Sequence, residues 1–267
     1  MSDLVSIIMP VFNAERFVGE AINSVLNQTH QNWELIVVND GSTDRSAEII
    51  QRYKDDRIKY FEQENHGVSY ARNKGLTEMQ GNFLCFLDAD DLLTEVSLSS
   101  RLEKFSDNKE LTFVDGKVLK VDEERRDTIG SWQPSYYGNP IEDLVALGGR
   151  SFVGISWMIK NPDNGIRFRE DMTHGEDLLY YIEWSRRGGL YDFTDEVILK
   201  YRIHTSSAMS SLGGLGEGYR KLYHHLQNLK LSADLIKQFR SKVRSIMFKS
   251  YLRKGNVVKA LSWAWKV

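Results

Sequence analysis

The sequence predicts an α/β protein with a doubly wound, mostly parallel sheet and a C-terminal helical extension. Two observations lead to this prediction. Three apolar runs, at residues 5–9, 33–38 and 83–87, lack the polar alternation of half-exposed strands, so they are typical of strands buried on both faces of a sheet. Stretches with helical spacing of apolar residues separate these runs. Such a repeating strand–helix order indicates parallel strands joined by crossover helices.

The first part of the chain is expected to follow this order throughout. Asn13 is expected to cap the first helix, and Asp91 is expected to start a turn or cap the last helix of this part. The expected elements are a strand at 5–9, a helix at 17–26, a strand at 33–38, a helix at 46–53, a strand at 58–61, a helix at 67–79, a strand at 83–87 and a helix at 95–105.

The pattern is less regular after residue 111. Gly and Ser are frequent in residues 204–218, which predicts a mobile loop. The expected elements are a strand at 112–121, an irregular segment at 131–149, an apolar segment at 152–160, a helix at Glu176–Arg186, a strand at 197–203 and amphipathic helices over 222–267.

Composition narrows the class of protein. The 267 residues are enough for one large α/β domain, or for one domain with a small extension. The single cysteine, Cys85, excludes a disulfide framework and a Cys-ligated zinc site. No basic region precedes the first strand, so no signal peptide is expected. No apolar stretch reaches the ~20 residues of a membrane span. These features predict a cytoplasmic protein.

Charge is distributed unevenly along the chain. Residues 219–267 contain 12 Lys and Arg and one acidic residue, Asp234, whereas the first 218 residues contain 23 basic and 36 acidic residues. In residues 235–267 the basic side chains interleave with apolar ones, and Trp263 and Trp265 lie near the end. This pattern favours a helix on an anionic membrane surface. Helices that pack on the rest of the protein, or that dimerise, are the alternative. Nucleic acid is disfavoured because the rest of the chain is acidic.

Polar residues follow each of the first buried strands. Asn13 and Glu15 follow the first, Asp40 ends the second, and Asp88 and Asp90 follow the strand at 83–87. Carboxyl ends of parallel strands share one edge, where open α/β sheets bind ligands. Each residue alone is explained by turn chemistry, but carboxylates gathered together repel unless a cation or a donor offsets them. The pattern predicts a site for Mn²⁺ or Mg²⁺ with a phosphate-bearing ligand.

The absence of their motifs argues against several other nucleotide-binding and hydrolase sites. The chain has no G-x-x-x-x-G-K-[ST], so a P-loop is not expected. The first strand runs into PVFN rather than G-x-G-x-x-G, which disfavours a dinucleotide fold. The glycines at 213, 214, 216 and 218 have the wrong spacing for that motif. Neither G-x-S-x-G nor H-E-x-x-H is present.

Five short motifs together resemble the ordered signature of the family 2 glycosyltransferases. They are MPVFN at 9–13, VNDGSTD at 38–44, ARNKG at 71–75, FLDADD at 86–91 and GED at 175–177. The resemblance covers roughly residues 4–205. It implies a GT-A fold and an inverting transfer from a nucleotide sugar, usually a UDP-sugar, with Mn²⁺ or Mg²⁺ as cofactor.

The resemblance also implies roles for individual residues. Asp40 would accept a hydrogen bond from the uracil N3–H, Arg72 would lie near the diphosphate, and Asp90 would bind the metal. Asp88 would contact the ribose or the sugar, and it is a second candidate metal ligand. The residues implied in binding the donor are Pro10, Val11, Asn13, Glu15, Asp40, Arg72, Asp88, Ala89 and Asp90.

The resemblance further implies a catalytic base at the start of the helix Glu176–Arg186. Asp177 is the expected base, with Glu176 as the alternative; acidic residues in a first helical turn are also explained by the helix dipole. A base must reach the acceptor hydroxyl, and a metal can neutralise the charge that grows on the leaving UDP. His204 is the third candidate metal ligand, reaching the metal or the diphosphate when the loop behind it closes; a surface or capping histidine is the alternative.

The family also implies a division of the chain and a class of acceptor. Residues 1–110 would form the nucleotide-sugar half of the GT-A domain, residues 111–218 the acceptor half, and residues 219–267 the basic helical extension. The acceptor would be a glycan or a lipid-linked saccharide in polysaccharide or lipopolysaccharide synthesis, at the inner face of the membrane. Four aromatic residues lie in the acceptor half and either stack on sugars or fill the core: Trp132, Tyr136, Tyr137 and Trp157.

Two other functions are compatible with the same carboxylates. A nucleotidyltransferase also uses an α/β sheet and paired carboxylates, but it needs a Gly-rich, basic loop where this chain has PVFNAE. A degenerate sugar-nucleotide-binding module would not need the full set of Asp40, Asp88, Asp90 and Asp177. The sugar, the linkage and the oligomeric state are not predicted.

Overall fold

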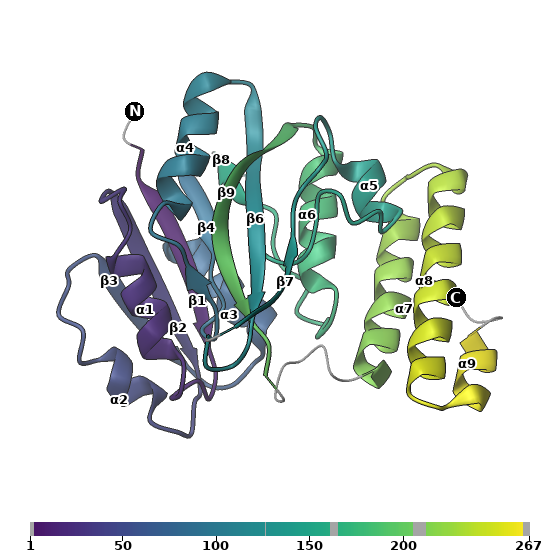
Figure 1. The fold of residues 1–267 in the computed structure, drawn as a ribbon, viewed down its shortest axis with the longest axis horizontal. Helices are drawn as coiled ribbons and strands as arrows, with labels where there is room; N and C mark the ends of the chain where they lie inside the picture. Colours follow the sequence, from purple (N-terminus) through teal and green to yellow (C-terminus); the bar gives the residue numbers. More distant parts are fainter. Residues whose placement is uncertain (1–2, 126, 161–164, 205–211, 264–267) are drawn as a thin grey trace.

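The computed structural model describes residues 3–125, 127–160, 165–204 and 212–263. Its centre is a nine-stranded sheet in the order β3-β2-β1-β4-β8-β6-β9-β5, with β7 paired to β6. Helices cover both faces of the sheet, and α7, α8 and α9 stand together on the side away from β3 (Figure 1). The predicted α/β class and the helical extension are confirmed.

The first half of the sheet is parallel throughout. β1 pairs with β2 and β4, and β2 pairs with β3, all in the same direction. Every residue of β1 and β2 is buried, which explains their unbroken apolar runs. The elements are β1 (Val5–Val11), α1 (Val18–Leu26), β2 (Trp33–Asp40), α2 (Ser46–Ile50), β3 (Ile58–Gln63), α3 (Val68–Glu78) and β4 (Phe83–Phe86).

The second half mixes strand directions. β8 runs antiparallel to both β4 and β6, whereas β9 runs parallel to β6. The short β8 therefore joins the two halves into one sheet. The elements are β5 (Leu92–Leu93), α4 (Ser97–Asp107), β6 (Leu111–Val121), β7 (Thr128–Trp132), α5 (Ile141–Val145), β8 (Met158–Lys160), α6 (Glu176–Arg186) and β9 (Leu190–Arg202).

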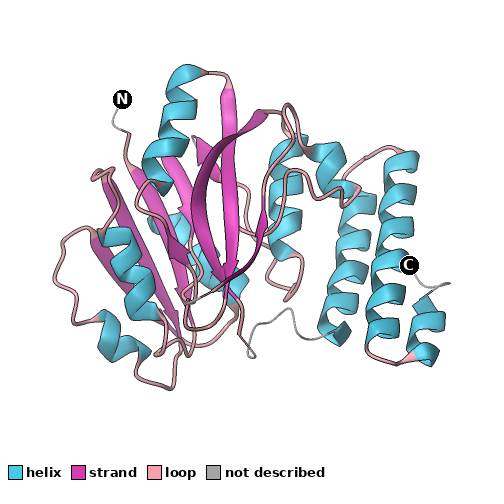
Figure 2. Ribbon diagram, viewed as in Figure 1, coloured by secondary structure: helices cyan, strands magenta, loops and turns pink. Residues whose placement is uncertain are grey.

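Alternate residues of β1 pack on opposite faces of the sheet. Ile7 and Met9 belong to the core that includes buried residues of α1 and α4, whereas Ile8 belongs to the core that includes α3 and α6. Figure 2 shows these helices in two layers around the strands. This period of two is the pleat of a strand whose two faces are both covered.

The C-terminal helices begin earlier than the sequence predicts. They are α7 (Leu212–Asn228), α8 (Ala233–Arg253) and α9 (Val257–Trp263). The predicted loop over 204–218 is wrong from Leu212 to Gly218, which are helical. Residues 205–211 of that loop lie outside the described residues. The boundaries at 110 and 218 stay predictions.

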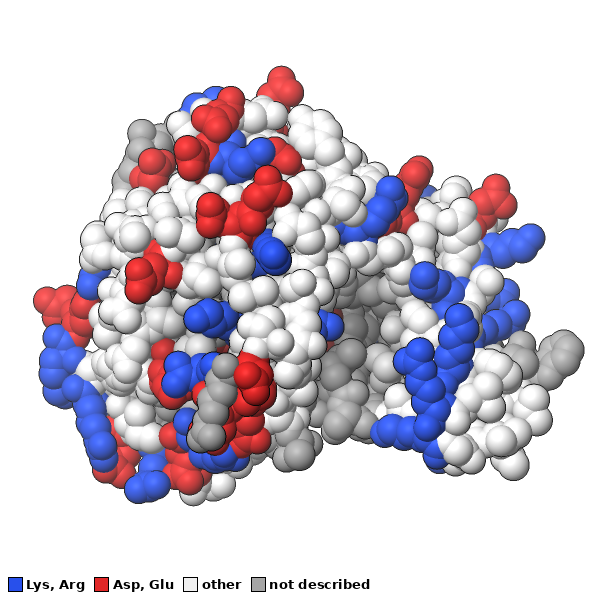
Figure 3. Space-filling view, in the orientation of Figure 1, with Lys and Arg blue, Asp and Glu red and all other residues white. Residues whose placement is uncertain are grey.

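The apolar stripe of α8 faces the protein. Phe239, Val243 and Met247 have no exposed surface, and Trp263 of α9 is 3% exposed. These residues join the core that also contains α6 and α7, which is the packing alternative for this stripe. Trp265 lies outside the described residues. Figure 3 shows Lys and Arg spread along these helices, from their upper to their lower part. Within the described residues, no helix combines the length and apolarity that crossing a bilayer requires.

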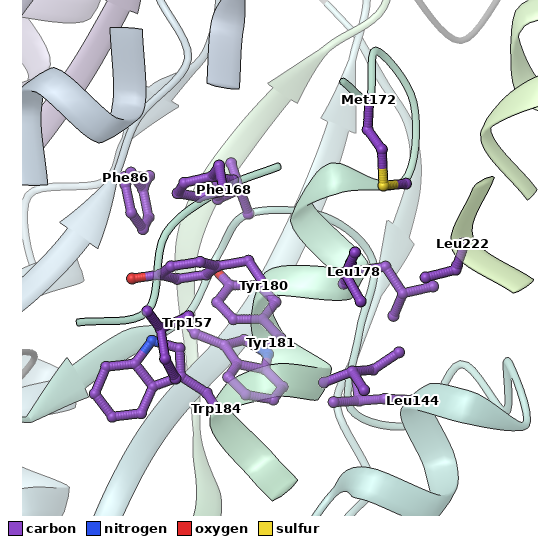
Figure 4. Close-up of a cluster of buried hydrophobic side chains, with 14 of the residues drawn as sticks. Phe86, Leu144, Trp157, Phe168, Met172, Leu178, Tyr180, Tyr181, Trp184 and Leu222 are labelled. Atoms are coloured by element: carbon purple, nitrogen blue, oxygen red, sulfur yellow. The ribbon is translucent and has the colours of Figure 1, made fainter. Parts of the chain in front are cut away.

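An aromatic cluster fixes α6 against the sheet. The rings of Trp157 and Tyr181 stack with centroids 4.2 Å apart, and those of Phe168 and Tyr180 stack at 4.1 Å. Figure 4 shows this layered arrangement beside Phe86. Trp157 is therefore a core residue and is excluded as an acceptor contact.

The other three aromatic candidates lie nearer the surface. Trp132 donates from Nε1 to the carbonyl of Gly149, and the Tyr136 hydroxyl donates to the carbonyl of Asn139. Tyr137 is 60% exposed and stays a candidate for stacking on a sugar.

Two predicted caps are wrong. α1 begins after Phe17 and has no side-chain cap, so Asn13 does not cap it. α4 begins after Val96, again without a side-chain cap, and Asp91 lies five residues earlier in a buried position. Both polar side chains are used in contacts between distant segments, which short-range patterns do not reveal.

Candidate active site

The carboxyl ends of three parallel strands meet at one edge of the sheet. β1 pairs with β2 on one side and with β4 on the other. Val11 ends β1, and Asp40 ends β2 one residue beyond the position that pairs with Val11. β4 ends at Phe86, so Asp88 and Asp90 follow at the same edge. The polar residues that end these strands therefore share one edge of the sheet, as parallel pairing requires.

Pro10 lies just beyond the end of the β1–β4 ladder. The Ile8 carbonyl accepts a hydrogen bond from the Leu87 N–H, so β1 at Pro10, two residues on, also faces the side of β4. The β1–β4 ladder stops where Ile8 pairs with Phe86. The N–H that Pro10 lacks would thus lie beyond the ladder, so the proline removes no strand hydrogen bond. Pro10 and Val11 are both buried, and they are the last two residues of β1.

Asn13 and Glu15 tie together the loops that follow β1 and β2. Asn13 has a φ of 49°, and its Oδ1 accepts from the Thr43 N–H at 2.8 Å. Glu15 accepts from Arg45 Nε at 3.0 Å through Oε2, and its N–H donates to Asp44 at 2.9 Å. The side chains of Asn13 and Glu15 therefore lie beside the edge as ties between loops.

Asp40 is held by the chain on both oxygens. Its Oδ1 accepts from Gln63 Nε2 at 2.7 Å and from the His66 N–H at 3.0 Å, and its Oδ2 accepts from the Gly67 N–H at 2.8 Å. Asp40 is 2% exposed. A carboxylate offers about four acceptor positions, so one remains for a further donor.

Arg72 of α3 connects two parts of the site. Its guanidinium donates to Asp88 Oδ1 at 2.8 Å and to Glu176 Oε1 at 3.0 Å. The Arg72 residue is 4% exposed. Burial lowers the pKa of Arg72, but the carboxylates of Asp88 and Glu176 outweigh burial and raise its pKa overall. The guanidinium therefore joins the end of β4 to the start of α6 as a permanent cation.

Asp90 lies beside His204, which follows β9. His204 Nε2 is 2.8 Å from Asp90 Oδ2, and the two side chains are 6% and 36% exposed. Burial raises the pKa of Asp90, the neighbouring Asp88 raises it further, and His204 opposes both effects. Ala89, between the two aspartates, is buried in the core below. Of the three predicted metal candidates, the structure thus brings Asp90 and His204 into contact, whereas Asp88 is bound to Arg72.

Asp91 binds the end of β9 instead of capping a helix. Its Oδ1 accepts from the Arg202 N–H at 2.8 Å. Arg202 is 3% exposed, and its guanidinium donates to Glu20 at 2.6 Å and lies 4.6 Å from the centroid of the Phe17 ring. Arg202 was not expected in the site from the sequence, although it lies only two residues before the metal candidate His204. This contact sets where His204 leaves the sheet.

Asp177 and Glu176 begin α6, but they have different partners. Glu176 is bound to Arg72, whereas Asp177 Oδ1 accepts from the Leu178 N–H at 2.7 Å. Burial and the repulsion from Glu176 raise the pKa of Asp177 to about 7, although Arg72 opposes them. A carboxylate with a pKa near neutral pH is suited to accept a proton.

α7 supports the turn that precedes these acids. Gly214 and Gly218 face His174 so closely that a Cβ on Gly214 would overlap the His174 ring, and one on Gly218 would overlap its carbonyl. Gly213, one residue earlier, has open space around its Cβ position. From the sequence these glycines were expected only in a flexible loop, because a contact between α7 and the turn before α6 leaves no local signal.

The donor set at Asp88 and Asp90 fits a hard divalent cation. Each carboxylate shares one oxygen with a neighbouring cationic or imidazole group, and the raised pKa of Asp90 reflects burial and repulsion that a cation would relieve. Mg²⁺ commonly takes one or two carboxylates and completes its shell with water and phosphates. Across the described residues, no group of three or more His, Cys, Asp and Glu is arranged to hold a metal alone. The described residues therefore supply a pair of carboxylates at this edge and no complete set of metal ligands.

This chain belongs to glycosyltransferase family 2. Residues 6–162 match the family described as "Glycosyl transferase family 2". An uncharacterised glycosyltransferase of Rickettsia bellii is 34% identical over 200 residues, 74% of this chain and 29% of the relative. EpsJ of Bacillus subtilis, also an uncharacterised glycosyltransferase, is 31% identical over 221 residues, 78% of this chain and 63% of the relative. The chain thus spans less than two thirds of the length of these relatives.

Solved structures share the fold at low sequence identity. S. aureus TarS 1-349 in complex with UDP-GlcNAc has a TM-score of 0.70 at 17% identity, over 97% of this chain and 90% of that chain. A mannosyltransferase from Pyrobaculum calidifontis, in complex with GDP-Man and Mn²⁺, has a TM-score of 0.67 at 14% identity, over 97% of this chain and 73% of that chain. The fold of this chain is therefore the GT-A fold.

The raised pKa of Asp177 predicts how the free energy of unfolding depends on pH. Between about pH 4 and pH 7 the folded protein keeps a proton on Asp177 that the unfolded chain has lost, so the folded state loses stability as pH rises through this window. Asp177→Asn removes this penalty, and we expect added stability of up to about 4 kcal/mol at pH 8 and little at pH 4.

Urea unfolding of the wild type and of Asp177→Asn at both pH values measures this difference. Asp56→Asn, at an exposed loop position, is the control and should shift unfolding equally at both. An Asp177→Asn variant that is less stable than the wild type at pH 8 would contradict the assigned environment.

Proposed function

We propose that this protein transfers a sugar from a UDP-sugar to a hydroxyl of a glycan or lipid-linked acceptor, with inversion at the sugar carbon. The observation that carries the proposal is the Arg72 bridge, which puts the carboxylates after β4 and those at the start of α6 in one site. Membership of family 2 supports a sugar transfer, and the TarS complexes with UDP-GlcNAc and UDP support a uridine donor. Inversion needs a single displacement and one base.

Asp177 is the proposed catalytic base. Glu176 uses one oxygen to bind Arg72, and moving it would leave a buried guanidinium partly unpaired. Asp177 has a pKa of about 7 and a single side-chain hydrogen bond, to its neighbouring backbone N–H. It would take the proton of the acceptor hydroxyl as the oxygen attacks the sugar carbon. The geometry supports Asp177 over Glu176 for this role.

The proposed donor site uses the rest of the edge. Asp40 would accept from the uracil N3–H with its remaining acceptor position. Arg72 supplies positive charge near the diphosphate, and its bond to Asp88 keeps that charge oriented. Backbone at Pro10 and Val11 would line the nucleotide, with Asn13, Glu15 and Ala89 fixing the loops around it.

The proposed cofactor is Mn²⁺ or Mg²⁺ held by Asp90, with Asp88 and His204 beside it. A divalent cation would neutralise the negative charge that develops on the leaving diphosphate. The support is the oxygen-rich donor set and the repulsion between Asp88 and Asp90. The mannosyltransferase of similar fold was solved with Mn²⁺.

The acceptor is proposed to belong to a cell-surface polysaccharide. TuaG of Bacillus subtilis, named as a putative teichuronic acid biosynthesis glycosyltransferase, is 43% identical over 103 residues, 38% of this chain and 41% of the relative. This likeness supports a polysaccharide product, and lipopolysaccharide is the second possibility. We propose a peripheral location at the inner face of the membrane.

Removing the proposed base should stop transfer without stopping donor binding. General bases contribute about 10²–10⁴-fold to rates, so we expect Asp177→Asn to lose at least 100-fold in kcat while UDP still stabilises the protein. The transfer rate of the wild type should rise with pH through about 7, because only ionised Asp177 accepts a proton. A coupled assay that detects the UDP released from the donor measures kcat of both proteins and the pH dependence of the wild type.

Glu176→Gln is the matched variant for this experiment. It weakens the partner of Arg72, so it should lower UDP affinity as well as rate. An Asp177→Asn enzyme with unchanged turnover would rule out Asp177 as the base.

Nucleotide binding can be measured without knowing the acceptor. UDP at 100 times its dissociation constant should add about 2.7 kcal/mol to the free energy of unfolding. Thermal unfolding with UDP, GDP and ADP, each with and without Mn²⁺, should give the largest shift for UDP with Mn²⁺. Asp90→Asn should lose the part that depends on Mn²⁺. No shift with any nucleotide would contradict the donor site.

The support that α7 gives to the base can be tested at two neighbouring glycines. Gly214→Val would push His174 and displace the start of α6, and we expect kcat to fall about tenfold or more because a displacement of about 1 Å can cost 100-fold. Gly213→Val adds the same side chain to the same helix where space is open. Equal losses of kcat in the two variants would show that valine acts by destabilising α7, and not by displacing the start of α6.

A further inference from the structure

Residues 252–261 cover the end of α8, the turn after it and most of α9, and they expose several apolar side chains; we call this segment the helical tip. Leu252 is 41% exposed, Val257 53%, Val258 81% and Leu261 56%. A contiguous exposed apolar group usually marks a contact surface, whereas single exposed apolar residues are ordinary. The helical tip is therefore a candidate interface.

Positive charge surrounds these apolar side chains. Arg253, Lys254 and Lys259 are exposed within the tip, and Lys242 and Lys249 are exposed on α8. No acidic residue follows Asp234 in the sequence. Figure 3 shows Lys and Arg predominating over the C-terminal helices on this face of the molecule, whereas both signs mix over the rest. An anionic partner would be attracted to this region.

The apolar stripe of α8 is not part of this surface. Phe239, Val243 and Met247 are buried against the rest of the protein, as is Trp263. An amphipathic helix that lay flat on a bilayer would need that stripe exposed. Because this stripe is buried, α8 cannot insert along its length into a membrane interface. The exposed apolar side chains of the helical tip can.

The helical tip lies at the same end of the molecule as the candidate active site. In Figure 1 the turn between α8 and α9 is at the lower end of the molecule, where β1, β2 and β4 also end. A flat surface that touched the tip would face the edge that holds Asp88 and Asp90. Acceptor groups on that surface would then approach the site without crossing the body of the protein.

We propose that the helical tip docks on an anionic lipid membrane, with Leu252, Val257, Val258 and Leu261 entering the interface. Arg253, Lys254 and Lys259 would contact lipid phosphates around them. Charge complementarity supports an anionic surface, and exposed aliphatic side chains would gain nothing from nucleic acid phosphates. The acceptor is then a lipid-linked saccharide; this last step rests on the proposed function, whereas docking does not.

Vesicle binding by the full chain tests the docking. The protein should co-float with vesicles of equal parts phosphatidylglycerol and phosphatidylcholine, and not with phosphatidylcholine alone. The triple variant R253Q/K254Q/K259Q should bind about 100-fold more weakly, because each basic residue near an anionic surface contributes about fivefold. Val258→Asp should weaken binding about tenfold by placing a charge among the apolar contacts.

Matched controls separate the tip from general charge and hydrophobicity. R52Q/K54Q/K109Q removes three exposed charges from the catalytic part, and Ile129→Asp changes an exposed aliphatic residue that is 56% exposed. Both should bind vesicles like the wild type. Thermal unfolding of every variant with and without UDP checks that the fold and the donor site are intact.

Two outcomes would overturn the proposal. Equal vesicle binding by wild type and both tip variants would exclude the tip, whatever the donor experiment gives. Salt-sensitive dimerisation that the tip variants abolish, with no vesicle binding by the wild type, would assign the tip to a second copy of the chain. Vesicle binding without any nucleotide effect would keep the docking and reject the proposed transfer, so the two failures can be told apart.

Discussion

The site depends on one buried cation, the guanidinium of Arg72. It binds Asp88 after β4 and Glu176 at the start of α6, which are 88 residues apart in the chain. A buried arginine needs partners, and buried carboxylates need a cation, so each stabilises a position that would be costly alone. Removing one member of the buried Arg72–Glu176 pair typically costs about 3–5 kcal/mol. The bridge therefore fixes the end of β4 relative to the start of α6, where the proposed base lies.

Crowded carboxylates are the second constraint on this edge. Asp88, Asp90 and Asp91 follow one another closely, and the fold gives each a different partner: Arg72, His204 and the backbone of Arg202. Repulsion is relieved but not removed, because the pKa values of Asp90 and Asp91 stay raised. A ligand that brings positive charge to this edge would reduce the repulsion between these carboxylates, and this reduction would add to its binding free energy.

The C-terminal helices connect the site to the proposed membrane surface. α7 packs on His174, just before the acids of α6, and Gly216 of α7 lies so close to Trp263 of α9 that a Cβ there would clash. α8 buries its apolar stripe and exposes its basic residues. Packing thus places one helical unit against the turn that precedes α6, where the proposed base lies, and leaves its helical tip exposed to solvent.

The sequence by itself determined the parallel first half of the sheet, the bounds of α6 and the identity of the polar residues after each strand. These follow from local patterns: unbroken apolar runs, helical spacing and short motifs. It could not determine that Asn13 and Asp91 tie segments instead of capping helices, that residues 212–218 are helical, or that the stripe of α8 faces inward. Only the tertiary structure decided these, because each depends on a partner distant in sequence. A hydrogen bond or a close contact across 100 residues leaves no periodic signal in the chain.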